Sequence, residues 1–181
     1  MQLMARTVLQ DCRNAIYDHS IKLQGESFRI SWVAIITLLR TVGHVLRKVD
    51  SQLSKDHKVV IDNHWQALNS SKPEPKIFWG FIEQERNNVL KQYKFGVERW
   101  MQVPGPVLPQ GPTVLRMDMA NSRGGRWVNE NSFPIHTQIP SGPFKGWKES
   151  DVIEMAASWW DEQLSEIEDS LIERGVNVEL G

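Results

Sequence analysis

Two segments of the sequence carry apolar residues at alternating spacings of four and three positions. The first has them at Phe28, Trp32, Ile35, Leu39, Val42, Leu46 and Val49. The second has them at Ile153, Ala157, Trp160, Leu164, Ile167 and Leu171. Such a seam repeats every 3.5 residues on average and is typical of helices that pack lengthwise against one another. The chain is therefore expected to contain an antiparallel helical bundle.

Three weaker patterns predict further helices in the first half of the chain. Apolar stripes indicate helices over residues 5–19, 51–68 and 76–101. The last of these has its predicted buried side at Phe78, Phe81, Ile82, Val89, Tyr93 and Trp100. A length of 181 residues fits a single domain. We predict a mainly α fold, residues 1–181, with about five helices that include an acidic C-terminal helix over residues 150–174.

Residues 103–146 interrupt the helical patterns. They hold seven of the nine prolines and six of the twelve glycines in the chain, and both residue types break helices. We expect an inserted irregular arm with one short β-hairpin. Its predicted strands are residues 113–119 and 126–128, joined by a turn that contains Gly124 and Gly125.

Charge is distributed unevenly along the chain, although the net charge is −1. Residues 1–60 carry +4, residues 61–146 carry +3 and residues 147–181 carry −8. In one interpretation, the acidic C-terminal helix packs beside the basic helices. In the other, the basic surface binds an anionic partner through phosphate contacts, and the acidic helix masks that surface or holds a basic protein partner.

The sequence predicts a cytoplasmic protein without a cofactor or a metal. Its single cysteine, Cys12, excludes an intramolecular disulfide and lies on an apolar stripe, which indicates a core residue. The most apolar helical run, Ile30 to Leu39, is shorter than the about 20 residues that span a bilayer, so no membrane association is expected. No pair of histidines has the i, i+4 spacing of helical metal sites, and no phosphate-binding glycine loop is present.

Arg40, His44 and Arg47 follow one another at spacings of four and three. On a helix, these spacings place the three side chains on one face, beside the apolar seam. Two guanidinium groups around an imidazole suit a phosphate group, and the imidazole can move a proton near neutral pH. The alternative is a helix flank whose charges reach water while the imidazole pairs with a neighbour.

The segment from residue 81 to residue 93, FIEQERNNVLKQY, contains Arg86, Asn87, Lys91 and Tyr93. It resembles the signature of the HEPN superfamily, small helical bundles found in prokaryotic toxins, defence systems and RNases. That signature has an arginine, often an asparagine, then a histidine a few residues later and sometimes a tyrosine two positions further on. The resemblance covers this motif and the helical order of residues 5–101. Lys91 departs from it, because it occupies the position of the histidine.

The resemblance implies that Arg86 steadies an RNA phosphodiester without a metal, while residue 91 would move a proton. A lysine with its ordinary pKa of about 10.4 is a poor base at neutral pH, although it still offers a positive charge to phosphate. We therefore expect a binding site or a weakened catalytic site, with His44 in place of the missing histidine if its helix faces Lys91. The alternative for Arg86 is an ion pair with Glu83 or Glu85, or with the acidic C-terminal helix.

Three functional hypotheses follow. The first is a HEPN-like, RNA-associated protein with weak or no catalysis, in a defence or toxin–antitoxin setting, which would bind RNA phosphate through Arg40, Arg47, Asn87 and Tyr93. The second is a non-enzymatic interaction or scaffold protein that binds a basic protein or a second copy through the acidic helix and the arm. The resemblance also implies a two-fold homodimer, because HEPN domains often dimerise with their motifs facing. The third is an active RNase built on His44 and Arg86.

Overall fold

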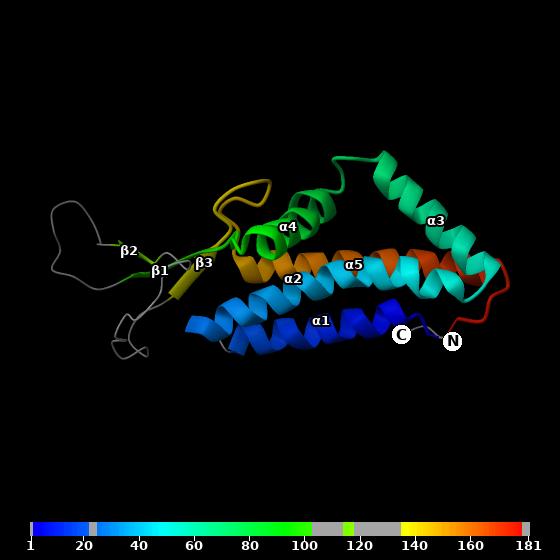
Figure 1. The fold of residues 1–181 in the computed structure, drawn as a ribbon, viewed down its shortest axis with the longest axis horizontal. Coiled ribbons are helices and arrows are strands. Elements are labelled where there is room, and N and C mark those ends of the chain that lie inside the picture. The colour runs from blue at the N-terminus through cyan, green and yellow to red at the C-terminus, as the bar shows by residue number, and fades with distance from the viewer. Residues whose placement is uncertain (1, 22–24, 103–113, 118–134, 179–181) are drawn as a thin grey trace.

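The computed structural model describes residues 2–21, 25–102, 114–117 and 135–178, and these are mainly helical (Figure 1). The elements follow in the order α1 (Met4–Ile21), α2 (Gly25–Lys48), η1 (Asp50–Gln52), α3 (Lys55–Ser70), η2 (Ile77–Ile82), α4 (Glu83–Gln92), β1 (Glu98–Gln102), β2 (Val114–Met117), β3 (Ile135–Gln138) and α5 (Glu149–Glu173). Helices α1, α2 and α5 run lengthwise beside one another, and α4 lies across their upper side in Figure 1. The predicted mainly α bundle is confirmed.

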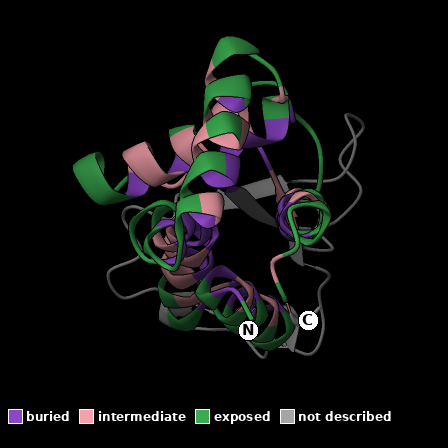
Figure 2. Ribbon diagram, turned by 90° about the vertical axis from the view of Figure 1, so that its right-hand side faces the viewer, coloured by how far each residue is buried: buried purple, intermediate pink, exposed green. Residues whose placement is uncertain are grey.

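The two apolar seams form the centre of the bundle. Six of the seven seam residues of the α2 segment and all six of α5 are buried, whereas Val49, beyond the end of α2, is exposed. Figure 2 shows the buried faces of the helices turned toward one another and the exposed faces turned outward. Cys12 belongs to this core, as predicted, and its burial raises the pKa of its thiol to about 12.

The segment Ser27–Gln52 is long and apolar enough to cross a membrane by length and composition, with a mean hydropathy of 1.3. The apolar run from Ile30 to Leu39 is only part of this segment. Core helices of soluble proteins have the same length and composition, and the seam of α2 packs against α1, α4 and α5. The run Ile30 to Leu39 is too short to span a bilayer, whereas the whole segment Ser27–Gln52 is long enough.

Helix α1 begins where a distant side chain caps it. The carboxylate of Asp50, in η1, accepts hydrogen bonds from the backbone N–H groups of Met4 (2.9 Å) and Ala5 (3.0 Å). The first N–H groups of a helix have no partner within the helix, so Asp50 fills the role that a local capping residue usually has. Burial raises the pKa of Asp50, and the two backbone hydrogen bonds oppose that rise.

The predicted helix over residues 76–101 is wrong at its C-terminal end. It consists of the π-helical segment η2 followed by α4, which ends at Gln92 because Tyr93 adopts a left-handed conformation with φ of 51°. This conformation is a common stop signal for helices, and it turns Tyr93 to the surface, where it is 64% exposed instead of buried as predicted. The chain then becomes extended, and Glu98–Gln102 forms β1.

A three-stranded antiparallel sheet with the order β2-β1-β3 extends from one end of the bundle (Figure 1). The predicted strand over residues 113–119 contains β2, which pairs with β1 in the register Trp100 opposite Arg116. The predicted returning strand, residues 126–128, lies outside the described residues, as does most of the predicted arm.

The acidic helix α5 packs beside α1, the first helix of the net positive segment 1–60, as the first interpretation of the charge pattern expects. Arg6 forms an ion pair with Glu168 (2.6 Å) and another with Asp161. Arg13 also pairs with Asp161, at 2.9 Å. Part of the negative charge of α5 is thus neutralised inside the bundle.

Candidate functional site

The basic face of α2 is turned toward α3 and toward the segment that contains η2 and α4. The guanidinium carbon of Arg40 lies 6.0 Å from the ring centroid of Trp65 in α3, and that of Arg47 lies 4.7 Å from it. Arg40 also lies 5.8 Å from the ring centroid of Phe78 in η2. The predicted common face of Arg40 and Arg47 is therefore directed into the angle between α2, α3 and η2.

Arg40 is an internal brace rather than a free cation. Its Nε lies 2.6 Å from the Oε2 of Glu83 at the start of α4, and the two side chains are only 12% and 27% exposed. The pair lacks the alignment of a hydrogen bond, but opposite charges at this distance attract strongly in a partly buried setting. Arg40 therefore joins α2 to α4, and its charge is largely matched within the protein.

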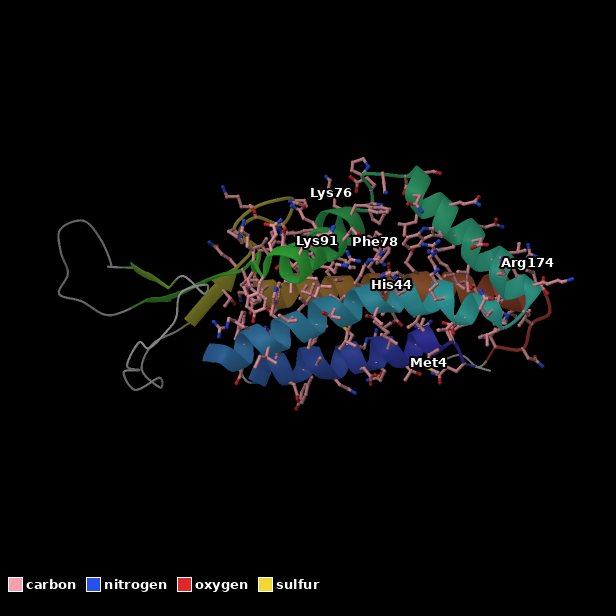
Figure 3. The ribbon with its side chains drawn as sticks, viewed as in Figure 1. Met4, His44, Lys76, Phe78, Lys91 and Arg174 are labelled. Carbon is pink, nitrogen blue, oxygen red and sulfur yellow. The ribbon has the colours of Figure 1, made fainter. Side chains whose placement is uncertain are left out.

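His44 is exposed on α2, one helical turn beyond Arg40 (Figure 3). Partial burial lowers the pKa of its imidazole, and the positive charges of Arg40, Arg86 and Arg47 lower it further, against the opposing charge of Glu83. The imidazole is consequently neutral at neutral pH. The charge of Arg86, on α4, therefore acts on this imidazole together with the charges of the α2 arginines.

Arg86 has no carboxylate partner among the described residues. It is half-buried, and its Nη1 donates a hydrogen bond to the Oδ1 of Asn87 at 2.7 Å. Two of the predicted partners are engaged elsewhere, because Glu83 pairs with Arg40 and Glu85 accepts hydrogen bonds from the indole of Trp32 (2.9 Å) and other donors. The third, the acidic helix α5, forms no ion pair with Arg86 among the described residues. Among the described residues, no acidic group therefore neutralises the guanidinium of Arg86.

The other two motif residues lie further along the chain. Lys91 is exposed near the C-terminal end of α4, five residues and so about 7.5 Å along the helix axis beyond Arg86. Figure 3 shows it displaced from His44 toward the sheet end of the molecule. Tyr93 follows the end of α4 and packs against Phe95, with ring centroids 5.0 Å apart. The charge of Arg86 acts on His44, whereas Lys91 is not among the charges that do so.

Trp65 is a site residue that the sequence patterns do not predict. It lies on α3, whose apolar face is weakly marked, and it is half-buried against the guanidinium groups of α2. The only sequence signal is a tryptophan in an otherwise polar stretch, Asn63-His64-Trp65-Gln66. Its neighbours Arg40 and Arg47 lie 25 and 18 residues earlier and Phe78 lies 13 residues later, separations that no local periodicity reveals.

A small pocket lies apart from this basic face, between α4 and residues 139–144. The buried carboxylate of Glu85 lines it together with Gln84 and Asn88. A carboxylate repels phosphate, so this pocket is not suited to the predicted ligand. In the part of the chain that the structure describes, no group of three or more histidine, cysteine or acidic residues is arranged to hold a metal ion.

Comparison of the chain with protein family models, with curated proteins and with solved structures gives no match. The arrangement of charged groups is therefore the basis for any functional conclusion. We refer below to His44, Arg47 and Arg86 as the basic cluster.

Proposed function

We propose that this protein binds RNA through the basic cluster, as a HEPN-like protein with weak or no catalytic activity. The observation that carries the proposal is Arg86, a half-buried guanidinium that has no carboxylate partner among the described residues and whose charge acts on His44 together with that of Arg47. Unmatched arginines at a junction of helices suit phosphate, which accepts hydrogen bonds from a guanidinium in a fixed geometry. A defence or toxin–antitoxin setting rests on the motif resemblance alone.

The same cluster supports only limited chemistry. Arg86 can steady a phosphodiester, and the neutral imidazole of His44 can accept a proton. Lys91 follows Arg86 by five residues on α4 and is not among the charges that act on His44. RNA binding with little turnover therefore fits these residues better than an efficient RNase does.

The test is replacement of Arg86 by alanine. We expect the Arg86→Ala variant to bind mixed RNA roughly tenfold more weakly in a mobility-shift assay at low salt, because one charged hydrogen-bonding contact is worth about 1.5 kcal/mol. Lys145→Ala, which removes an exposed cation from the loop before α5, serves as the control and should bind as the wild type does. Full RNA binding by Arg86→Ala would refute the proposal.

The alternative function is a non-enzymatic interaction protein. Exposed carboxylates on α5, at Glu162, Glu166, Asp169 and Glu173, favour it because the pairs with α1 leave them available to a basic protein partner. A homodimer is part of this alternative. Light scattering that shows a monomer across a wide range of concentrations would count against the homodimer.

A further inference from the structure

Two tryptophans beside the basic cluster each carry a cation over the ring. The guanidinium carbon of Arg47 lies 4.7 Å from the ring centroid of Trp65, and the Nζ of Lys72 lies 3.7 Å from that of Trp79. Both distances are within the range of cation–π attraction. We call Trp65 and Trp79, with these two cations, the tryptophan pair.

Phe78 holds the two tryptophans together. Its ring meets Trp65 edge-on at 5.7 Å and Trp79 edge-on at 4.7 Å, with interplanar angles of 88° in both cases. Phe78 itself is fully buried against Trp160 of the core. The separation of the two tryptophan centroids therefore cannot exceed the sum of these two distances, and both rings rest on a fixed base.

The two rings are also held in place and are only partly covered. Both tryptophans are half-buried, unlike Trp32 and Trp160, which are fully buried. The indole N–H of Trp79 donates a hydrogen bond to the carbonyl oxygen of Leu68 at 3.3 Å, which ties η2 to the end of α3. Rings that are fixed and partly exposed lose little conformational entropy when a flat ligand stacks on them.

The tryptophan pair continues the basic cluster. Arg47 belongs to both, because it lies over Trp65 and its charge acts on His44. Phosphate groups bound by Arg86 and Arg47 would therefore have aromatic rings and the guanidinium plane of Arg47 nearby. A nucleobase can stack on the guanidinium plane over Trp65, or on Trp79 when the exposed side chain of Lys72 moves aside. It can do so only if it is unpaired, since base pairing and stacking in a duplex cover its faces.

We infer that the tryptophan pair stacks unpaired nucleobases and that the ligand of the basic cluster is single-stranded. This inference rests on the proposed function and names the form of RNA that the site takes. It also assigns Trp65, Trp79 and Lys72 to the binding surface, in addition to the residues of the motif.

The test compares three labelled ligands of the same length, about 12 nucleotides, which falls within the site sizes of single-strand binders. They are a single-stranded RNA, an abasic strand with the same phosphates, and a duplex. By fluorescence anisotropy, we expect the wild type to bind the single strand at least tenfold more tightly than the other two, because each stacked base contributes about 1–3 kcal/mol. Trp65→Leu and Trp79→Leu should each reduce this preference and leave binding to the abasic strand unchanged.

Trp147→Leu is the matched control, since Trp147 is 46% exposed and lies in the loop before α5. It should retain the full preference for bases. If a leucine variant loses its helical circular dichroism signal, Trp65→Phe takes its place, because a smaller ring keeps the packing and should weaken the preference only partly.

In the wild type, the base-containing strand should quench tryptophan fluorescence and the abasic strand should not.

The outcomes separate this inference from the proposed function. Equal affinity of the wild type for all three ligands would overturn the inference and leave RNA binding through phosphate standing. An equal loss in Trp147→Leu would also overturn it. Absence of binding to any ligand would overturn both proposals.

Discussion

At the scale of single residues, the charge of the His44 side chain is a property of the site that pH can change. Partial burial and the surrounding arginines lower the pKa of its imidazole below the ordinary value of about 6.5. The side chain is therefore neutral at pH 7 and gains its proton only as the pH falls through this lowered pKa. Below that pH, the basic cluster holds one more positive charge.

We predict that RNA binding tightens as the pH is lowered from about 7 to 5, because protonated His44 adds a phosphate contact near its lowered pKa. Anisotropy titrations at constant ionic strength measure the effect. His44→Gln keeps a polar side chain that does not titrate in this range, so its affinity should change less with pH. An identical rise in His44→Gln would assign the effect to another group.

Sequence reasoning reached some residues of the site and missed others for a physical reason. Arg40, His44 and Arg47 lie on a single helix, and helical geometry alone predicts that they share a face. The brace between Arg40 and Glu83 joins two helices, as do the contacts of Trp65. Such contacts depend on how helices pack, which the spacing of residues within one helix does not determine.

At the scale of elements, the contact between α1 and α5 rests on two arginines in different surroundings. Arg6 is 9% exposed and pairs with Glu168, which has no exposed surface. Arg13 and Asp161 are 41% and 40% exposed. Burial alone would raise the pKa of Asp161, but hydrogen bonds and charges from Arg13 and Arg6 outweigh it and lower the pKa.

We predict that Arg6→Met lowers the free energy of unfolding by about 3 kcal/mol, because it leaves the buried carboxylate of Glu168 unpaired. Arg13→Met removes the same kind of group from a solvated pair and should cost less than about 1 kcal/mol. Urea unfolding followed by circular dichroism gives both values. Equal losses in the two variants would mean that the pair with Glu168 is not the dominant contact.

The helices show where a sequence pattern is sufficient to predict an element. The seams of α2 and α5 predicted these helices closely, because long amphipathic segments have few other ways to bury their apolar residues. The end of α4 was missed, because the apolar pattern continues through Tyr93 while the backbone turns there. A left-handed residue other than glycine leaves no clear mark in the sequence.

At the scale of the whole molecule, the net charge of −1 conceals a local basic surface. Contacts between α1 and α5 match positive with negative charge, whereas Arg47, Arg86 and Lys72 have no carboxylate partner among the described residues. Binding to an anionic strand at this surface would release counterions, and its affinity would therefore depend on salt.

We predict that the logarithm of the RNA association constant falls with the logarithm of salt concentration with a slope of about −2, as three phosphate contacts to a single strand imply. Arg86→Ala should make the slope shallower by about 0.7. Anisotropy titrations between about 50 and 200 mM salt measure both slopes. A slope that Arg86→Ala leaves unchanged would show that this arginine contacts no phosphate.

The hydrogen bonds of Glu85 have a consequence for how the chain leaves the bundle. This buried carboxylate accepts hydrogen bonds from the indole of Trp32 and from the backbone N–H of Gly96 (2.7 Å), just before β1. A methyl group on residue 96 would overlap an oxygen of that carboxylate. A larger side chain at residue 96 would therefore displace the hydrogen-bond partner of Trp32, a core residue 64 positions away in the sequence.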